Sequence, residues 1–345
     1  MGDSSTRIVV QLFSQDTRPQ DAWKGVSEAV VTHVNYLING FDGACPQTAR
    51  FLDQSKDATA GRVYEIIATP GSHGEPIKPL SLRQCKTITD DDWFQKFSAA
   101  NEIEIVLQPY DLYALHKKPG LAVFDMDSTL IQQEVIDELA RAVGLYDQVA
   151  AITEAAMRGE EPYTDFEASL RARVALLKGV PNSIWEKMKA EIITFTPGAH
   201  DLLRTLKKLG WKAAVLSGGF TPLANWVKET LGLDYAFANH LVSDPALEQL
   251  TGELVQEAPI IHGQKKRELL LQLAKENGIP TEQVIAVGDG SNDLPMMDAA
   301  GLGIAFNAKP KVQLAAPSKL NSRELSDVLY VLGYTKEEID SATSS

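Results

Sequence analysis

The chain has 345 residues, of which 44% are hydrophobic and 23% are charged, a composition typical of a globular protein with about two domains. Its formal net charge of −13 argues against a protein that binds nucleic acid or an anionic membrane surface. No apolar run reaches the ~18 residues of a transmembrane helix, and the first residues, MGDSSTRIVV, lack the pattern of a secretory signal. Cys45 and Cys85 are too few for a disulfide framework, so we expect reduced thiols and a cytoplasmic protein.

Residues 1–112 alternate β-branched runs with amphipathic stretches, and we interpret them as an N-terminal domain. Runs such as RIVVQLF and VYEIIAT indicate strands, and apolar residues at helical spacing from Trp23 to Leu37 indicate a long helix. The order βαββαβ suggests an α+β ferredoxin-like sandwich. The predicted elements are strand 7–13, helix 21–41, a weak strand at 49–52, strand 62–68, helix 90–100 and strand 102–108.

This N-terminal domain has no cluster of histidines, cysteines or carboxylates that points to chemistry. By pattern alone it resembles the ACT-type regulatory domains, and that resemblance implies an amino-acid ligand such as serine. The alternative is a module that serves only for packing or for joining two copies of the chain into a homodimer.

The second part of the chain contains three short apolar runs, LAVF, AAVL and VIAV, each followed by a polar turn. These turns begin at Asp125, Ser217 and Gly288. Apolar strands that alternate with helices indicate a Rossmann-like α/β domain with a parallel sheet, which we place at residues 113–335, with residues 336–345 as a tail. Because sites in such sheets lie at the carboxyl ends of the strands, we expect the three turns to converge on one crevice.

One connection is far too long for a simple crossover. Asp125 and Ala213 are 88 residues apart, whereas a crossover between parallel strands needs about a dozen or more. We interpret residues 135–195 as a helical cap inserted over the crevice; the alternative is a group of extra helices packed behind the sheet. The helices predicted in this excess are 135–142, 149–157 and 165–177.

The first turn, DMDST, places the carboxylates of Asp125 and Asp127 at a strand end. Oxygen ligands of this kind suit Mg²⁺, and a carboxylate is also a competent nucleophile toward phosphorus. Taken alone, the pair also fits an acidic helix N-cap. The third turn, GDGSND, adds Asp289, Asn292 and Asp293, and two acidic turns at parallel strand ends favour a shared site.

The remaining polar turn and a lysine offer groups that bind anions. In the Ser217-Gly218-Gly219 turn, a hydroxyl and successive backbone N–H groups can form a small anion nest, although such a turn is a weak signal by itself. Lys266 lies near the start of a predicted helix in GQKKRELL and, alone, would fit a solvated side chain. A phosphate held among carboxylates needs a cation, which gives Lys266 its interest.

Together, DMDST, VLSGG, a lysine before a helix and GDGSND, in that order, resemble the four motifs of the haloacid dehalogenase superfamily of phosphatases. With AMRGE, DFEASLRARVALLKG and VIAVGDGSNDLPM, residues 115–330 are similar to the phosphoserine phosphatases. The resemblance implies Mg²⁺-dependent hydrolysis of O-phospho-L-serine to L-serine and phosphate through a phosphoaspartate. That reaction is the last step of serine biosynthesis, and the resemblance implies one Mg²⁺ per active site.

The same resemblance assigns roles at the phosphate end of the site. It implies that Asp125 is the nucleophile and that Asp127 acts as general acid and then as general base. It places Mg²⁺ on the Asp125 side chain, the Asp127 backbone carbonyl and Asp289, with Asp293 in support. The residues that would hold the transferring phosphoryl group are Ser217, Gly218, Lys266 and Asn292.

Phosphoserine also carries an ammonium and a carboxylate, and a selective site needs a partner for each because an unpaired buried charge is costly. The resemblance places the amino group at Glu134 and the carboxylate at Arg173, which can bind it bidentately. Phe166 lies seven residues before Arg173, on the same helix face, and with Met157 it would form an apolar lid. The stretch from Met157 to Phe166 is a few residues longer than is usual for the family.

Two other functions are compatible with these motifs. The first keeps the chemistry but changes the substrate or acceptor, as in a phosphotransferase or a phosphatase for another small phosphomonoester. The second is a non-catalytic module that merely accepts a phosphoryl group on aspartate and acts as a sensor. The long helical insertion, Asp127 and the GDGSND turn argue against this second alternative.

Overall fold

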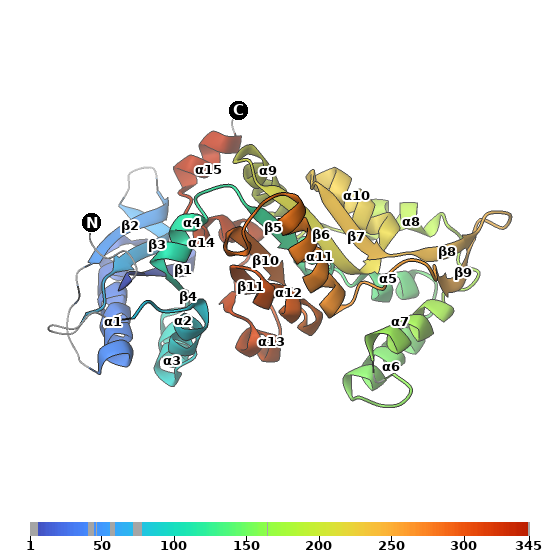
Figure 1. Cartoon of the computed structure of the whole chain (residues 1–345), viewed down its shortest axis with the longest axis horizontal. Helices are drawn as coiled ribbons and strands as arrows, with labels where there is room; N and C mark the ends of the chain where they lie inside the picture. The colour runs from blue at the N-terminus through green and yellow to red at the C-terminus, as the bar shows by residue number, and fades with distance from the viewer. Residues whose placement is uncertain are drawn as a thin grey trace.

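The structure is a computed structural model of the chain. It has an antiparallel sheet with its helices at one end of the long axis, a parallel sheet in the middle and two projecting helices at the other end (Figure 1). Apart from the side chain of Met157, the residues that it describes are 6–40, 45, 47–55, 59–71, 78–163 and 165–343.

The N-terminal sheet is antiparallel, with strand order β2-β3-β1-β4, and the predicted ferredoxin-like sandwich is confirmed. The sequence prediction missed one helix, α2. Its N-terminus carries a capping box formed by Ser81 and Gln84, which is a recognisable sequence signal. The elements are β1 (Ile8–Pro19), α1 (Gln20–Asn39), β2 (Gln47–Gln54), β3 (Ala60–Ala68), α2 (Leu82–Thr89), α3 (Asp92–Asn101) and β4 (Ile103–Pro109).

Both faces of this sheet are buried, because successive side chains of a strand point to opposite faces. On β1, Val10 and Leu12 pack into a core with Trp23 of α1, whereas Phe13 belongs to the core of the second domain. Two buried amides join the second face to the C-terminal part of the chain. Gln11 Nε2 donates to the Tyr330 carbonyl at 2.6 Å, and Gln108 Nε2 donates to the Val331 carbonyl at 2.8 Å.

The second sheet has six parallel strands in the order β12-β11-β10-β5-β6-β7, and the predicted Rossmann-like domain is confirmed. Its strands are β5 (Leu121–Phe124), β6 (Lys212–Phe220), β7 (Tyr235–Asn239), β10 (Val284–Gly288), β11 (Leu302–Phe306) and β12 (Ser318–Leu320). The helices that follow or flank them are α4 (Tyr110–Leu115), α9 (Ala199–Lys208), α10 (Thr221–Leu231), α11 (Gly263–Glu276), α12 (Leu294–Ala299), α13 (Pro310–Ala315), α14 (Val328–Val331) and α15 (Lys336–Thr343). Residues 336–345, expected as a tail, thus include a helix that packs against α9.

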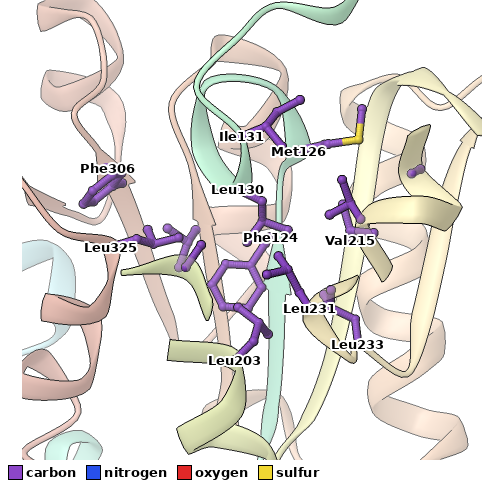
Figure 2. Close-up of a cluster of buried hydrophobic side chains, with 14 of the residues drawn as sticks. Phe124, Met126, Leu130, Ile131, Leu203, Val215, Leu231, Leu233, Phe306 and Leu325 are labelled. Carbon is purple, nitrogen blue, oxygen red and sulfur yellow. The ribbon is translucent and has the colours of Figure 1, made fainter. Parts of the chain in front are cut away.

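The core beneath the site is centred on the short strand β5. Phe124, the last residue of β5, is fully buried and lies among Leu130, Leu203, Val215 and Leu231 (Figure 2). This packing fixes the end of β5, and the chain turns directly from Phe124 into the acidic DMDST sequence.

The long connection between β5 and β6 is helical, and the predicted inserted cap is confirmed. Helices α6 and α7 project away from the parallel sheet (Figure 1), so they do not pack behind it. A hairpin of β8 (Leu241–Asp244) and β9 (Gln249–Leu254) supports the cap, and the Leu250 carbonyl accepts from Gly179 N at 2.8 Å. The helices of the cap are α5 (Val135–Ala142), α6 (Tyr146–Met157), α7 (Phe166–Ala175) and α8 (Ile184–Lys187).

None of the helices in the described part of the chain is both long enough and apolar enough to cross a membrane.

A partly buried ion pair joins the N-terminal sheet to the second domain and yields a stability prediction. Arg62 of β3 binds Asp327 through two hydrogen bonds of 2.7 and 2.6 Å, and Asp327 is only 1% exposed. Replacing Arg62 by alanine would leave this carboxylate buried without its cation, so we expect a loss of about 3 kcal/mol in the free energy of unfolding. Urea denaturation measures the loss.

Arg83→Ala is the matched control, because Arg83 also pairs with an aspartate of the second domain, Asp298, but at the surface. Exposed pairs contribute about 1 kcal/mol or less. Equal losses in the two variants would contradict the importance given to the Arg62 pair.

Candidate active site

The parallel register brings the three polar turns together. In the sheet, Phe124 of β5 pairs with Val287 of β10 on one side and with Val215 of β6 on the other. Asp125 therefore follows β5 beside the end of β10 and beside the part of β6 that leads into Ser217, and its backbone N–H donates to the Val287 carbonyl at 2.9 Å. The strand register therefore brings the three polar sequences together, as predicted.

A buried lysine connects two of the acidic turns. Lys266, in the first turns of α11, is fully buried, and its Nζ lies 2.8 Å from Asp125 Oδ1 and 2.6 Å from Asp293 Oδ1. Burial alone would lower the pKa of Lys266, but the charges of Asp125 and Asp293 outweigh it and raise that pKa above its ordinary value. This raised pKa favours the ammonium form of Lys266 inside the site.

Three carboxylates form an oxygen cluster that can hold a cation. Ligand oxygens of Asp125, Asp289 and Asp293 all lie within 4.8 Å of one another. Burial, reinforced by the charge of Asp293, raises the pKa of Asp125 well above its ordinary value and raises that of Asp289 to about 7. One ammonium cannot balance this much negative charge, and a hard divalent cation such as Mg²⁺ suits an all-oxygen donor set. The residues therefore fit the expected cofactor class.

The backbone of the first turn directs the second carboxylate, that of Asp127, into the buried site. Within residues 126–130, Asp127 is not helical and Ser128 has a left-handed φ of 54°. Asp127 Oδ1 is buried and has no hydrogen-bond partner among the described residues. Burial and then the charge of Glu134 raise the pKa of Asp127 well above its ordinary value, which favours a protonated carboxyl group that can donate a proton.

The Ser217-Gly218-Gly219 sequence was predicted to form a turn after a strand, but it lies in the carboxyl-terminal part of β6 itself, where the pairing with β7 shifts register between Leu216 and Phe220. A methyl group on Gly219 would come within 3.2 Å of Asp127 Oδ2, so this backbone directly faces the second carboxylate. A methyl group on Gly218 would come within 3.2 Å of Cζ of Phe166, the first residue of α7. The cap thus places an aromatic ring against the predicted phosphate turn, and the absence of side chains at both glycines leaves room for the contacts.

The two residues expected to bind the ends of phosphoserine lie at the edge of the cap. Glu134 is exposed, and its Oε1 accepts from Ser128 Oγ at 2.8 Å. Arg173 is half-buried, and burial lowers its pKa against the opposing charges of Asp137 and Glu134. Among the described residues its guanidinium makes one hydrogen bond, from Nε to Ser169 O at 3.2 Å, and no ion pair within 4.0 Å.

The neighbouring arginine behaves as a surface residue, as the helical spacing predicts. Arg171 is exposed and pairs with Glu167 on the same helix at 2.7 Å. Asn292 lies partly exposed in the third turn, where its amide oxygen folds back on Gly290. Met157 ends α6, and its side chain lies outside the described residues, so its place in an apolar lid stays a prediction.

One polar side chain in the site was not singled out from the sequence. Thr129 is fully buried, and its Oγ1 donates to Asp289 Oδ1 at 2.9 Å. This bond links the first turn to the third and orients a carboxylate of the cluster. The available signal was its place in DMDST, where a hydroxyl follows two acidic residues and shares their turn.

The fold and the site define a haloacid dehalogenase-like hydrolase. The model of that family matches residues 122–298, which hold all three turns and the cap, and the chain belongs to this family. It is 49% identical over 231 residues to the phosphoserine phosphatase of Streptomyces coelicolor, a match of 66% of this chain and 54% of that protein. It is 47% identical over 240 residues to the phosphoserine phosphatase of Saccharomyces cerevisiae, covering 69% of this chain and 75% of that protein.

The similarity to solved structures extends beyond the catalytic part. A HAD family hydrolase from Salmonella enterica serovar Typhi is 28% identical, with a TM-score of 0.73 over 95% of this chain and 98% of the other. Both sheets are therefore included in the likeness. The chain spans only about half the length of the Streptomyces relative.

The raised pKa of Asp289 predicts how cation binding depends on pH. With a pKa of about 7 in the metal-free protein, this carboxyl group is mostly protonated at pH 6 and mostly ionised at pH 8. A cation must displace the proton, so we expect the affinity for Mg²⁺ to be about tenfold higher at pH 8 than at pH 6. Titration calorimetry at constant ionic strength measures it.

The control for this experiment is Asp289→Asn, which cannot lose a proton and should bind Mg²⁺ weakly at both pH values. Equal wild-type affinities at pH 6 and pH 8 would contradict a cation site that depends on this carboxylate.

Proposed function

We propose that this protein is a Mg²⁺-dependent phosphoserine phosphatase, which converts O-phospho-L-serine and water to L-serine and phosphate as the last step of serine biosynthesis. The observation that carries the proposal is the buried carboxylate of Asp125 at the end of β5, held 2.8 Å from the Lys266 ammonium. The similarity to two proteins named phosphoserine phosphatase supports the choice of substrate.

Phosphoryl transfer begins at Asp125. One of its carboxylate oxygens attacks phosphorus, the bond from phosphorus to the seryl oxygen breaks, and a phosphoaspartate forms. Asp127 donates its proton to the seryl oxygen, and its raised pKa keeps that proton available near neutral pH. Asp127 is then an anion, so it can take a proton from the water that attacks the phosphoaspartate and releases phosphate.

The charge of the phosphoryl group is balanced by the groups around it. Lys266 faces the nucleophile, and the Ser217 hydroxyl and the Gly218 amide form the turn opposite Asp127. Asn292 completes the phosphate contacts. Transfer of a phosphoryl group depends mainly on positioning and on electrostatic stabilisation, which fixed donors supply.

We assign one Mg²⁺ to the carboxylate cluster. The Asp125 side chain, the backbone carbonyl of Asp127 and Asp289 would hold it, while Asp293 orients Lys266 and lies within reach of the same ion. When bound, Mg²⁺ neutralises negative charge on the phosphoryl oxygens. Thr129 orients Asp289 for this task through its hydrogen bond.

The seryl part of the substrate would lie beneath the cap. Glu134 supplies the anion for the ammonium, and Arg173 supplies a guanidinium whose outer N–H groups have no partner among the described residues. Phe166, which lies against Gly218, would exclude water from the transfer step together with Met157.

The remaining proposals concern the surroundings of the enzyme. Cys45 and Cys85 are free and buried, which suits the reducing cytoplasm that we propose as its location. That the N-terminal domain binds an amino acid, or joins two copies of the chain, stays a prediction from the sequence pattern.

Phosphate release from phosphoserine with and without Mg²⁺ is the direct test of the function. Asp125→Asn should lower kcat by at least ~10⁴-fold because the variant lacks the nucleophile, while its circular dichroism stays that of the wild type. Asp111→Asn, an exposed aspartate of α4, is the control and should keep full activity.

Three other results would contradict parts of the proposed function. Turnover retained by Asp125→Asn rules out this nucleophile. If the wild type cleaves other phosphate esters but not phosphoserine, another small phosphomonoester is the substrate. If it releases no phosphate from any ester, the non-catalytic alternative is correct.

The role of Arg173 is tested by comparing two substrates. Arg173→Ala should lower kcat/KM for phosphoserine by ~10- to 100-fold, the value of a hydrogen-bonded charge, but should change little for a phosphate ester without a carboxylate. Arg171→Ala is the matched control, because Arg171 is exposed on the same helix. Equal losses on both substrates would show that Arg173 does not read the carboxylate.

A further inference from the structure

Asn239, the last residue of β7, joins two parts of the site that are separate in the sequence. Its side chain is buried, and the residue is 1% exposed. Nδ2 donates to the carbonyl of Gly218 at 2.8 Å, and Oδ1 accepts from the backbone N–H of Ile261 at 2.9 Å. One amide group thus binds the predicted phosphate turn with one end and the segment before α11 with the other.

The first bond fixes the peptide group between Gly218 and Gly219. Its carbonyl is held by Asn239, and its N–H donates to Ser217 Oγ at 2.8 Å. With both polar ends engaged, this peptide cannot rotate without losing a buried hydrogen bond. Because Ser217 Oγ accepts from Gly219, the hydroxyl hydrogen is left to donate to another group.

The second bond fixes the entry into α11. Ile261 is followed directly by His262, the N-cap residue of α11, whose carbonyl accepts from the backbone N–H of Lys266 at 2.9 Å. The position of Ile261 therefore helps to set where the first turn of the helix begins, and this turn presents the Lys266 ammonium to Asp125.

Asn239 is itself firmly held. Its backbone pairs with Phe220 in the sheet, and its carbonyl accepts from Thr221 Oγ1 at 3.1 Å. The amide is thus anchored to β6 and β7, so it can act as a rigid spacer between the Ser217 turn and the Lys266 helix.

We propose that Asn239 is a positioning residue that fixes the distance and orientation between the two groups of phosphate donors, the Ser217-Gly218 turn and Lys266. The inference rests on the proposed function, because it takes those groups as the ones that bind the phosphoryl group. Misplacement of such donors by about 1 Å can cost ~100-fold in rate, although Asn239 itself touches no reacting atom.

The test uses two variants of the full chain. Asn239→Ala removes both bonds. Asn239→Asp keeps the shape and the acceptor for Ile261 but replaces the donor to Gly218 by an oxygen. In both we expect kcat/KM for phosphoserine to fall ~10- to 100-fold and the affinity for inorganic phosphate, measured by calorimetry with Mg²⁺ present, to fall in parallel. The affinity for Mg²⁺ alone should change less than ~3-fold, because none of the hydrogen bonds of Asn239 reaches the carboxylate cluster.

Asn307→Ala is the matched control. The side-chain amide of Asn307 also makes two hydrogen bonds with the backbone: it donates to Ser322 O at 2.7 Å and accepts from Ser322 N at 3.0 Å. It binds neither the Ser217 turn nor the segment before α11. We expect a loss of thermal stability at least as large as that of Asn239→Ala, because Asn307 has a left-handed φ of 45° that strains an alanine, with phosphate affinity close to that of the wild type.

The outcomes separate this inference from the proposed function. Wild-type phosphate affinity in the Asn239 variants overturns the inference, as does a parallel loss of Mg²⁺ affinity or an equal loss in Asn307→Ala. If Asn239→Ala does not fold, the near-isosteric Asn239→Asp decides. A wild type that binds phosphate but does not cleave phosphoserine refutes the proposed substrate and leaves the phosphate-binding test intact.

Discussion

The carboxylates of Asp125, Asp289 and Asp293 lie with the Lys266 ammonium at the buried carboxyl end of the parallel sheet, and this imbalance of charge shapes the site. Lys266 lies between Asp125 and Asp293 at hydrogen-bonding distance from both, so it compensates part of the negative charge and keeps two acidic turns close together. Burial, together with the negative charge of Asp293, raises the pKa of Asp289 to about 7. In the proposed function, a net acidic chain attracts a phosphate dianion because a divalent cation joins Lys266 at this point.

The surroundings of Lys266 are rigid because they are built from backbone as well as side chains. The core around Phe124 fixes the end of β5 (Figure 2), the register of the sheet aligns the turns, and Asn239 ties the phosphate turn to the segment before α11. The cap contacts this frame through the ring of Phe166 against Gly218 and through Glu134, which accepts from Ser128 Oγ. In the proposed function, the sheet carries the phosphoryl transfer and the cap selects the substrate, so the two tasks belong to different structural layers.

Sequence reasoning predicted the parts of the site that follow apolar strands, because strand ends and motif spacing are local signals. It could not predict Asn239, whose partners are backbone atoms 21 and 22 residues away, since a single asparagine after a strand fits an ordinary turn equally well. The pair of Arg62 and Asp327 is separated by 265 residues and depends on how two domains meet. Thr129 lies within the DMDST motif, yet only the structure shows that its hydroxyl reaches Asp289.

The second face of the N-terminal sheet has a consequence for how the chain comes apart. Phe13, Val63 and Val106 belong to the same continuous apolar core as Phe124, so this face of the N-terminal sheet shares its interior with the parallel sheet, while the other face keeps the core around Trp23. Separating them would expose these side chains and the buried amide of Gln11 to water at once. The molecule should therefore unfold in one cooperative transition. A shortened chain that begins at β5 would expose an apolar surface prone to aggregation in place of its N-terminal domain.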